Sequence, residues 1–531
     1  MKRMNAWKKL GAALLLVAML VSVFSGCNEE KSDGKVTEID WFINMQNWGD
    51  SGELWKTADA LKEIVDTTGV IPNVSIPTGM GAEKINLMMA TGDMPDLLTF
   101  DATDPQLNQL VESKAIYSMD ELIEKYDKEK KVEIPDSVRV FGAQQLDGVL
   151  YGFPSYLPPD WQVENKSGLN TSAFMVRSDI YEELGCPDMS TPEGFYNALV
   201  AFKEKYPEIN GKKTIPLCMW SSMNGIGRLA SSFGIKDFYI DEQGNYVSPW
   251  KNPQYEEFIK YMAKLNQAGL IDKEAYVKKP DQITEDLSNG LSFVVLWQFD
   301  AMIDINKSLD KVCPGARYKV IEPMNATDGP ITLRTFTRKP WLVTVVPREA
   351  KNPEAAFKLA SYMWSEECVL RRHYGVEGED WVRVDENTIQ QTDSYATRSQ
   401  EEGFREKTGI TTFRVIHHNW NRVLPPPSVE QPVYEKEDRP IADKYIDTEN
   451  MWRSLMKTAS PESEEGIIET RALNIISKAT PGIYMAKTED EGIAAWKKLL
   501  SDLDSIGYDK VEKFNTEEMK IAKERFSALE K

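Results

Sequence analysis

The chain between residues 36 and 101 alternates between two kinds of apolar pattern. Apolar and β-branched residues alternate with polar ones, or run continuously, in three predicted strands at 36–45, 70–79 and 96–101. Between these strands, apolar residues at helical spacing predict two helices, 53–68 and 82–91, each followed by a glycine that suits a helix end. This βαβαβ order with short loops predicts a doubly wound α/β unit.

The same alternation resumes beyond about residue 161. Residues 191–206 have helical spacing, with Thr191 suited to the cap and Pro192 to the first turn. Continuous apolar runs at 291–299 and 339–347 predict buried strands, and the chain after about residue 461 is mainly helical. A chain of 531 residues is too long for one hydrophobic core, so we expect two lobes.

The N-terminal residues have the pattern of a lipoprotein export signal. Residues 1–10 contain four basic side chains and no acid, an apolar run follows over 11–24, and the sequence then reads SGC, ending at Cys27. The apolar run is shorter than the ~20 residues that a membrane-spanning helix needs. The motif resembles a bacterial lipobox, with Phe24 where leucine is usual; the alternative is a secretory signal with an unrelated cysteine. We expect cleavage before Cys27, lipidation of its thiol, and a polar tether over 27–35.

The charge balance argues against one class of partner. The formal net charge is −20, and removal of the four basic residues of the signal leaves −20 − 4 = −24. A protein that binds nucleic acid needs a basic face, and the sequence has no block rich in lysine and arginine. We therefore expect no nucleic-acid partner, and the acidity is typical of a solvated surface.

The patterns of the common catalytic and metal sites are missing from the sequence. The chain has three histidines, and the adjacent pair His417 and His418 lacks the i, i+4 spacing of a helical zinc site. It has neither a GxSxG elbow nor a GxxxxGK[ST] phosphate loop. The four cysteines beyond Cys27 are widely spaced, so two disulfides are one option, but we expect free, buried thiols. We predict no catalytic residue, no cofactor and no metal.

Several longer motifs follow one another along the chain. They are KINLMMATGDMPDLL (84–98), DGVLYGFP (147–154), MVRSDIYEELGCPDMSTPEGFYNALVAFK (175–203), LNQAGLID (265–272), KNPEAAFKLASYMWS (351–365) and YGVEGEDW (374–381). In this order and behind a lipobox, they resemble the extracellular solute-binding proteins of family 1, the sugar receptors of ABC importers. The long Gram-positive lipoprotein branch is the most similar, and the resemblance runs from about residue 36 to the C-terminus.

The resemblance implies an α/β fold of the two-lobed periplasmic-binding-protein type (type II), with crossing strands and a ligand cleft between the lobes. The implied domains are a signal peptide (1–26), the lipidated tether (27–35), lobe one (36–157 plus 338–415) and lobe two (158–337 plus 416–531). Hinge motion at GFPSYLPP (152–159) and KPWLV (339–343) would close the lobes on the ligand.

One segment departs from the family pattern. Many relatives carry a calcium loop in the second lobe, where this chain has PEINGKKTIPL over 207–217. Lys212, Lys213 and Thr214 stand where oxygen ligands would be needed. We expect no calcium at this segment.

Aromatic and polar side chains near predicted strand ends are the candidate ligand contacts. Pyranose rings stack their C–H faces on aromatic rings and pair their hydroxyls with polar side chains. Such contacts belong at the C-terminal ends of strands that face the cleft. By resemblance, Phe100 and Asp101 occupy positions of an aromatic and a polar contact, and Trp297 that of a stacking tryptophan. The full predicted set is Asn44, Gln46, Trp48, Phe100, Asp101, Trp161, Trp220, Trp297, Gln298 and Arg334.

Each candidate also has a structural interpretation. Any of the tryptophans can serve core packing instead of binding. Arg334, together with Arg338, can form ordinary ion pairs or can meet the carboxylate of a uronic acid through its planar fork.

The sequence therefore predicts the substrate-binding lipoprotein of an oligosaccharide ABC importer. It would be a monomer, lipid-anchored on the extracellular face of a Gram-positive cell membrane, and would deliver unaltered ligand to permease subunits and their ATPase. The alternatives are a receptor for a peptide or another solute, a surface enzyme acting on glycosides with two carboxylates, and a lipoprotein that only mediates interactions.

Overall fold

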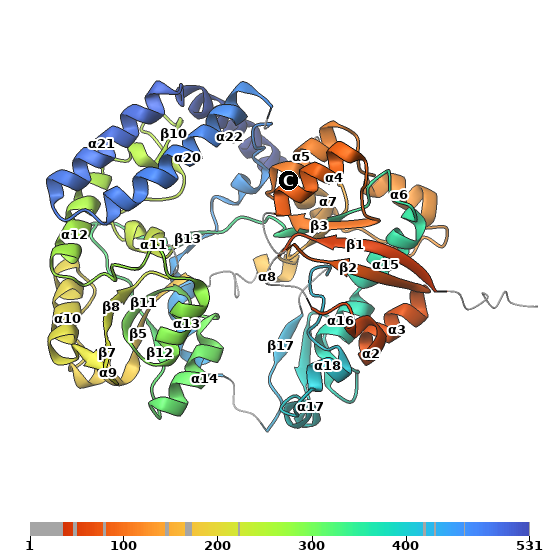
Figure 1. Ribbon diagram of the computed structural model, residues 1–531, viewed down its shortest axis with the longest axis horizontal. Helices are drawn as coiled ribbons and strands as arrows, with labels where there is room; N and C mark the ends of the chain where they lie inside the picture. The colour runs from red at the N-terminus through yellow and green to blue at the C-terminus, as the bar shows by residue number, and fades with distance from the viewer. Residues whose placement is uncertain are drawn as a thin grey trace, which may run out of the picture.

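The chain forms two α/β lobes that lie side by side, each built around its own sheet (Figure 1). The computed structural model describes residues 36–45, 50–77, 81–143, 148–164, 172–220, 224–417, 421–428, 432–460 and 462–529. Within those ranges, none of the helices has the length and apolar character needed to cross a bilayer.

The sheet of lobe one has the strand order β2-β1-β3-β14-β4. β1 (Thr37–Ile43) pairs in parallel with β2 (Val70–Ser75) and with β3 (Leu97–Asp101). β14 (Leu342–Val345) runs antiparallel to β3 and to β4 (Phe153–Ser155). Two stretches far apart in sequence, 153–155 and 342–345, thus lie side by side in one sheet.

The predicted βαβαβ order at the start of lobe one is confirmed. α3 (Asp59–Thr68) joins β1 to β2, and α4 (Gly81–Thr91) joins β2 to β3. The predicted helix over 53–68 is interrupted, because Ala58 has extended backbone angles that separate α2 (Leu54–Thr57) from α3.

Helices cover both faces of this sheet, so its strands are buried on both sides. One face packs against α4 and α5 (Pro105–Glu112). The other face packs against α3, α6 (Met119–Tyr126), α7 (Asp136–Gly142) and α15 (Pro353–Trp364), with α16 (Glu366–Tyr374) following α15. A small sheet follows, which consists of β15 (Trp381–Asp385), β16 (Thr388–Gln391) and β17 (Arg422–Leu424). Along the chain, α17 (Asp393–Arg398) and α18 (Phe404–Thr408) connect β16 to β17.

The sheet of lobe two has the strand order β12-β5-β11-β8. β11 (Ser292–Gln298) runs antiparallel to β5 (Ser172–Arg177) and parallel to β8 (Ile215–Cys218), and β12 (Tyr318–Ile321) pairs with the other edge of β5. The predicted strand over 291–299 is therefore confirmed as a central strand.

Two sets of helices enclose the second sheet. One face packs against α9 (Ser178–Glu183), α10 (Pro192–Lys205), α11 (Ile226–Ser231), α12 (Tyr255–Gln267), α20 (Glu464–Tyr484) and α21 (Glu489–Ser505). The other face packs against α13 (Pro280–Ser288) and α14 (Met302–Val312). Thr191 caps α10 by accepting a hydrogen bond from the Gly194 N–H at 3.1 Å, and Pro192 opens the helix, as predicted.

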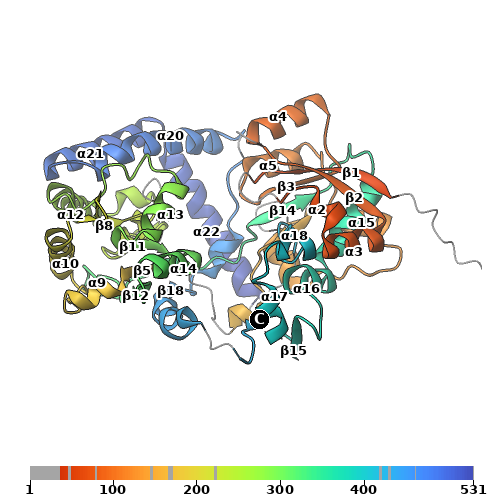
Figure 2. The same cartoon turned by 60° about the horizontal axis from the view of Figure 1, so that its bottom comes forward.

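Several segments of the described chain contribute to the cores of both lobes. In each of the following pairs, the first residue packs in the core of lobe two and the second in the core of lobe one. The pairs are Leu333 and Leu342, Tyr445 and Trp452, and, in α22 (Asp509–Leu529), Val511 and Met519. Figure 2 shows α22 running from one lobe to the other. The part of the chain after residue 416 was expected in lobe two, but Trp452 and Met519 pack in the core of lobe one. Links of this kind join the lobes by packing as well as by chain connection.

The segment over 207–217 forms a tight β-hairpin. β6 (Glu208–Ile209) pairs with β7 (Lys212–Lys213), and the two residues between them, Asn210 and Gly211, have φ angles of +52° and +72°. An Asn-Gly pair favours this kind of two-residue turn. The Lys212 ammonium lies 3.1 Å from the Glu285 carboxylate, so this side chain serves an ion pair.

The four described cysteines are free thiols, as predicted. Cys218 and Cys368 are buried and Cys313 is half-buried, but Cys186 is exposed, so the expectation of burial is wrong for that residue. Cys186 follows the end of α9 with a φ of +52°, in a turn at the surface.

Candidate ligand-binding site

Two tryptophans stack at adjoining strand ends of lobe two. The parallel register of β8 and β11 pairs Cys218 with Val295, an offset of 295 − 218 = 77 residues. The same offset places Trp297 beside Trp220, since 297 − 220 = 77. Their ring centroids are 5.2 Å apart and the rings are inclined by only 4°. Both side chains are partly exposed, so the stack presents aromatic surface at the edge of the sheet.

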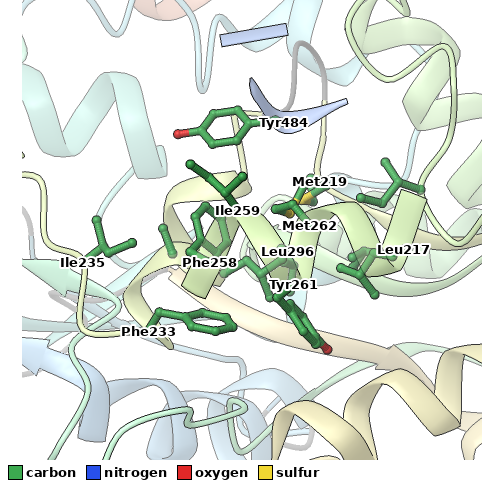
Figure 3. Close-up of a cluster of buried hydrophobic side chains, with 14 of the residues drawn as sticks. Leu217, Met219, Phe233, Ile235, Phe258, Ile259, Tyr261, Met262, Leu296 and Tyr484 are labelled. Carbon is green, nitrogen blue, oxygen red and sulfur yellow. The ribbon is translucent and has the colours of Figure 1, made fainter. Parts of the chain in front are cut away.

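The core beneath the strands orients this stack. Successive strand residues point to opposite faces, and Met219 and Leu296, which precede the two tryptophans, belong to the buried cluster drawn in Figure 3. Trp220 and Trp297 therefore pack against the cluster on the opposite face. Trp220 also has a φ of +60°, a left-handed conformation that costs a non-glycine residue on the order of 1–3 kcal/mol and is commonly retained at binding sites.

Gly225 brings α11 against the ends of these strands. A Cβ atom at this position would lie 2.1 Å from the carbonyl oxygen of Leu296 and 2.9 Å from that of Met219, so only glycine fits. The Gly225 N–H donates to the Met219 carbonyl at 2.8 Å. Because α11 begins at the next residue, this close contact determines where the side chain of Arg228 lies.

Arg228 lies on the tryptophan stack. Its guanidinium carbon is 4.8 Å from the centroid of the Trp297 ring, in cation–π contact. The buried Nε atom has no hydrogen-bond partner among the described residues. Burial, together with the nearby Arg334 guanidinium, lowers the pKa of Arg228 to about 10, and Asp300 partly offsets this effect. The side chain therefore remains a cation at neutral pH.

Gln298, Asp300 and Arg334 complete this region of lobe two. Gln298 follows Trp297 at the end of β11 and is half-buried. Arg334 begins β13 (Arg334–Thr335), which pairs in parallel with β18 (Ile446–Asp447). Asp300 and Arg334 are both exposed to solvent, yet surrounding protein raises the pKa of Asp300 and lowers that of Arg334.

Asn44 and two carboxylates lie at the strand ends of lobe one. Asn44 follows β1, and its Nδ2 donates to Asp104 Oδ2 at 3.3 Å. Asp101 ends β3, and its Oδ1 accepts from the N–H and the hydroxyl of Thr103 at 2.8 and 2.6 Å. Burial, and then the charge of Asp101, raises the pKa of Asp104 to about 6. This edge offers an amide and two carboxylates to the hydroxyl groups of a ligand.

The raised pKa of Asp104 predicts a pH-dependent stability. The folded protein holds this proton up to a higher pH than the unfolded chain does, so its free energy of unfolding falls as the pH rises from about 4 to about 6. We expect Asp104→Asn to raise the melting temperature by roughly 1–2 °C at pH 7.5 and to leave it unchanged below pH 4. Asp93→Asn, which alters an exposed carboxylate before β3, is the control and should have no effect. A lower melting temperature for Asp104→Asn at pH 7.5 would contradict this interpretation.

Phe100 is a core residue, and its prediction as a ligand contact is wrong. Its side chain has 0% exposure and packs with Phe42, Ile85 and Leu107 on the face of the sheet that α4 and α5 cover. Since helices cover both faces of this sheet, the side chain before the last strand residue has no route to solvent. Asp101 next to it is half-buried and lies at the strand end, where a ligand can reach it.

Trp161 lies apart from the tryptophan stack. It lies beside a cavity next to the two segments that are predicted to cross between the lobes, 152–159 and 339–343. It belongs to α8 (Asp160–Glu164) and is half-buried. The cavity has a volume of about 290 Å³ and includes Pro154, Arg338 and His417 in its lining. Arg338 is only 6% exposed and pairs with Asp160 at 2.6 Å, so it serves a structural ion pair.

The structure brings together Trp220, Trp297, Gln298 and Arg334 of the predicted contacts. Asn44 and Asp101 lie at the strand ends of the other lobe, and Gln46, Trp48 and Cys27 lie outside the described residues. Sequence reasoning missed Arg228, Asp300 and Asp104. The signal for Arg228 is the NGIGR segment, whose glycines allow a helix to begin directly against a strand end.

Comparison with known proteins agrees with this architecture. Residues 56–378 match the family model of the bacterial extracellular solute-binding proteins. Lipoprotein LipO of Bacillus subtilis is 22% identical over 391 residues, which covers 71% of this chain and 74% of LipO. The fructooligosaccharide ABC transporter substrate-binding protein FusA of Streptococcus pneumoniae is 31% identical over 316 residues, 56% of each chain.

Solved structures share the fold over nearly the whole chain. The structure of FusA in complex with kestose has a TM-score of 0.67 at 17% identity and covers 93% of this chain and 100% of FusA. The alginate-binding protein AlgQ2 without calcium ion has a TM-score of 0.66 at 20% identity and covers 92% of this chain and 99% of AlgQ2. With a match that spans more than half of its length and a two-lobed fold in common, this chain belongs to the bacterial extracellular solute-binding protein family.

Proposed function

We propose that this protein is the substrate-binding component of a carbohydrate ABC importer. The observation that carries the proposal is the Trp220–Trp297 stack at the C-terminal ends of β8 and β11. Flat aromatic surface suits the C–H face of a pyranose ring, and the neighbouring Gln298 and Asp300 suit its hydroxyls. The names of FusA and AlgQ2, which bind a fructooligosaccharide and alginate, support an oligosaccharide ligand.

The protein would bind its ligand between the lobes without altering it. Asn44 and Asp101 at the strand ends of lobe one would add polar contacts as hinge motion brings the lobes together. The loaded protein would then dock on the permease subunits, whose associated ATPase drives import.

The protein would act as a monomer. The sequence of the first 27 residues supports its anchoring on the extracellular face of the membrane. A lipid on Cys27 would hold the protein at the cell membrane, and residues 28–35 would serve as a tether. Fractionation of cells that make the full chain checks the anchor, because Cys27→Ser should move the protein from the membrane to the medium.

A thermal-shift screen of oligosaccharides tests the function. A sugar at 100 times its dissociation constant should add about 2.7 kcal/mol to the free energy of unfolding. Mass analysis of the incubated sugar then separates a receptor from an enzyme, since a receptor leaves it intact. Cleaved sugar would favour a glycosidase, and stabilisation only by peptides would favour a receptor for another solute; either result defeats the proposal.

A further inference from the structure

Arg228 has features that packing alone does not explain. Its guanidinium lies 4.8 Å from the Trp297 ring, and its buried Nε has no hydrogen-bond partner in the described part of the chain. A buried cation without a full set of partners is unfavourable, so most proteins pair or expose such a group. Here the close contact of Gly225 with the strand ends keeps the arginine in place.

The surroundings of Arg228 favour an anion. The Arg334 guanidinium is close enough to disfavour the charge of Arg228, and Asp300 offsets this effect only in part. Arg439 also belongs to this region: its guanidinium lies over Phe299 at 5.4 Å, and its buried Nη1 has no hydrogen-bond partner among the described residues. Glu435 takes the other nitrogens of Arg439. Arg228 and Arg439, which both interact with Asp300, thus each keep one guanidinium nitrogen without a hydrogen-bond partner among the described residues, in a protein whose net charge is −20.

We propose that the surface formed by Trp220, Trp297 and Arg228 selects oligosaccharides that carry a carboxylate, that is, uronic acid residues. This inference rests on the proposed function and names the class of its ligand. An indole ring would take the C–H face of one sugar unit, while the planar fork of Arg228 would bind the carboxylate of a uronic acid in the same oligosaccharide. With a neutral sugar, the charge of Arg228 would be offset only in part, by Asp300.

Calorimetry with matched pairs of sugars tests the inference. The probes are oligogalacturonates, the same oligomers as methyl esters, sulfated oligosaccharides, and a neutral panel of fructo-, xylo- and galacto-oligosaccharides. We expect a uronate oligomer to bind, and its methyl ester to bind roughly 10- to 100-fold more weakly, because a charge-assisted hydrogen bond is lost.

The variants Arg228→Gln and Arg228→Lys separate the contribution of the positive charge from that of the planar pair of guanidinium donors. Both variants should weaken uronate binding by at least about 10-fold, since lysine keeps the charge but not the planar pair of donors. Arg228→Gln should melt at the same or a higher temperature than the parent, because it removes a half-buried cation whose Nε has no hydrogen-bond partner among the described residues. Arg383→Gln is the matched control: that arginine lies over Trp381 at 5.8 Å in the small sheet, and its loss should not change affinity.

The outcomes distinguish this inference from the function it rests on. A neutral sugar or the methyl ester that binds as tightly as the uronate would overturn the inference and leave a sugar receptor. Preference for a sulfated sugar, or unchanged uronate affinity in Arg228→Gln, would overturn the carboxylate assignment in the same way. If no sugar of any panel binds, the proposed function fails and the inference fails with it.

Discussion

Trp297→Ala should weaken oligosaccharide binding by at least about 100-fold, or ~3 kcal/mol, while the fold remains intact. Aromatic anchors at the centre of a binding site commonly contribute this much. The substitution removes one ring of the stack, the neighbour that holds Trp220 in its position, and the surface on which Arg228 lies. Trp297→Phe keeps an aromatic face and should retain part of the affinity. Isothermal titration calorimetry with the ligand from the screen measures both effects.

Trp250→Ala is a matched control for this experiment. Trp250 also belongs to lobe two and also stacks on a ring, that of Tyr255 at 4.8 Å, but it packs among the C-terminal helices. Its loss should lower the melting temperature and leave the affinity unchanged. If Trp297→Ala bound sugar as well as the parent protein does, the stack would not be the binding surface.

Arg372→Met should reduce the free energy of unfolding by about 3–5 kcal/mol. The side chain of Arg372 has 0% exposure, and its guanidinium donates to the carbonyls of Met363, Thr412, Phe413 and Ile416. Methionine fills a similar length without donors, so these buried carbonyls would lose their partners at a cost of ~1–3 kcal/mol each. Chemical denaturation monitored by circular dichroism measures the loss.

The neighbouring arginine provides the control. Arg371 lies on the same helix, α16, but pairs with the exposed Glu63 carboxylate at 2.6 Å near the surface. Arg371→Met should therefore cost less than ~1 kcal/mol. Equal stabilities of the two variants would show that the buried hydrogen bonds of Arg372 contribute little.

Arg372 also bears on the region between the lobes. The segment that it holds, 412–416, leads directly to His417, whose N–H donates to the Ser155 hydroxyl at 3.1 Å. Ser155 pairs with Leu342 between β4 and β14, at the predicted crossings. We therefore expect ligand affinity to fall in Arg372→Met at temperatures where the protein is still folded, as the hinge region loosens.

Several sequence predictions held because they depend on local physics. The period of apolar residues and the glycines and caps at helix ends reflect interactions within a few residues, so β1, α4, β3 and α10 lie close to their predicted places. The continuous apolar run of β11 could be assigned to a buried strand from the sequence, because a strand covered on both faces needs apolar residues at every position. The two-lobed arrangement followed from chain length and from the resemblance.

Contacts between distant residues could not be predicted in the same way. Asp96 accepts hydrogen bonds from the N–H of Asp40 at 2.9 Å and from that of Asn352 at 2.7 Å, and so joins β1, β3 and the start of α15. Its partners lie 56 and 256 residues away along the chain. A pattern within one segment carries no information on which backbone groups such a carboxylate will meet.

The sequence by itself determined the order of strands and helices and the presence of tryptophans near strand ends. Only the tertiary structure decided which of these tryptophans lie together, because the pairing register of β8 and β11 places Trp220 beside Trp297, and the close packing of Gly225 places Arg228 over the Trp297 ring. The same sheet geometry buries Phe100, one residue before the half-buried end of its strand. A binding surface is a property of neighbours in space, and register and packing, rather than local pattern, set those neighbours.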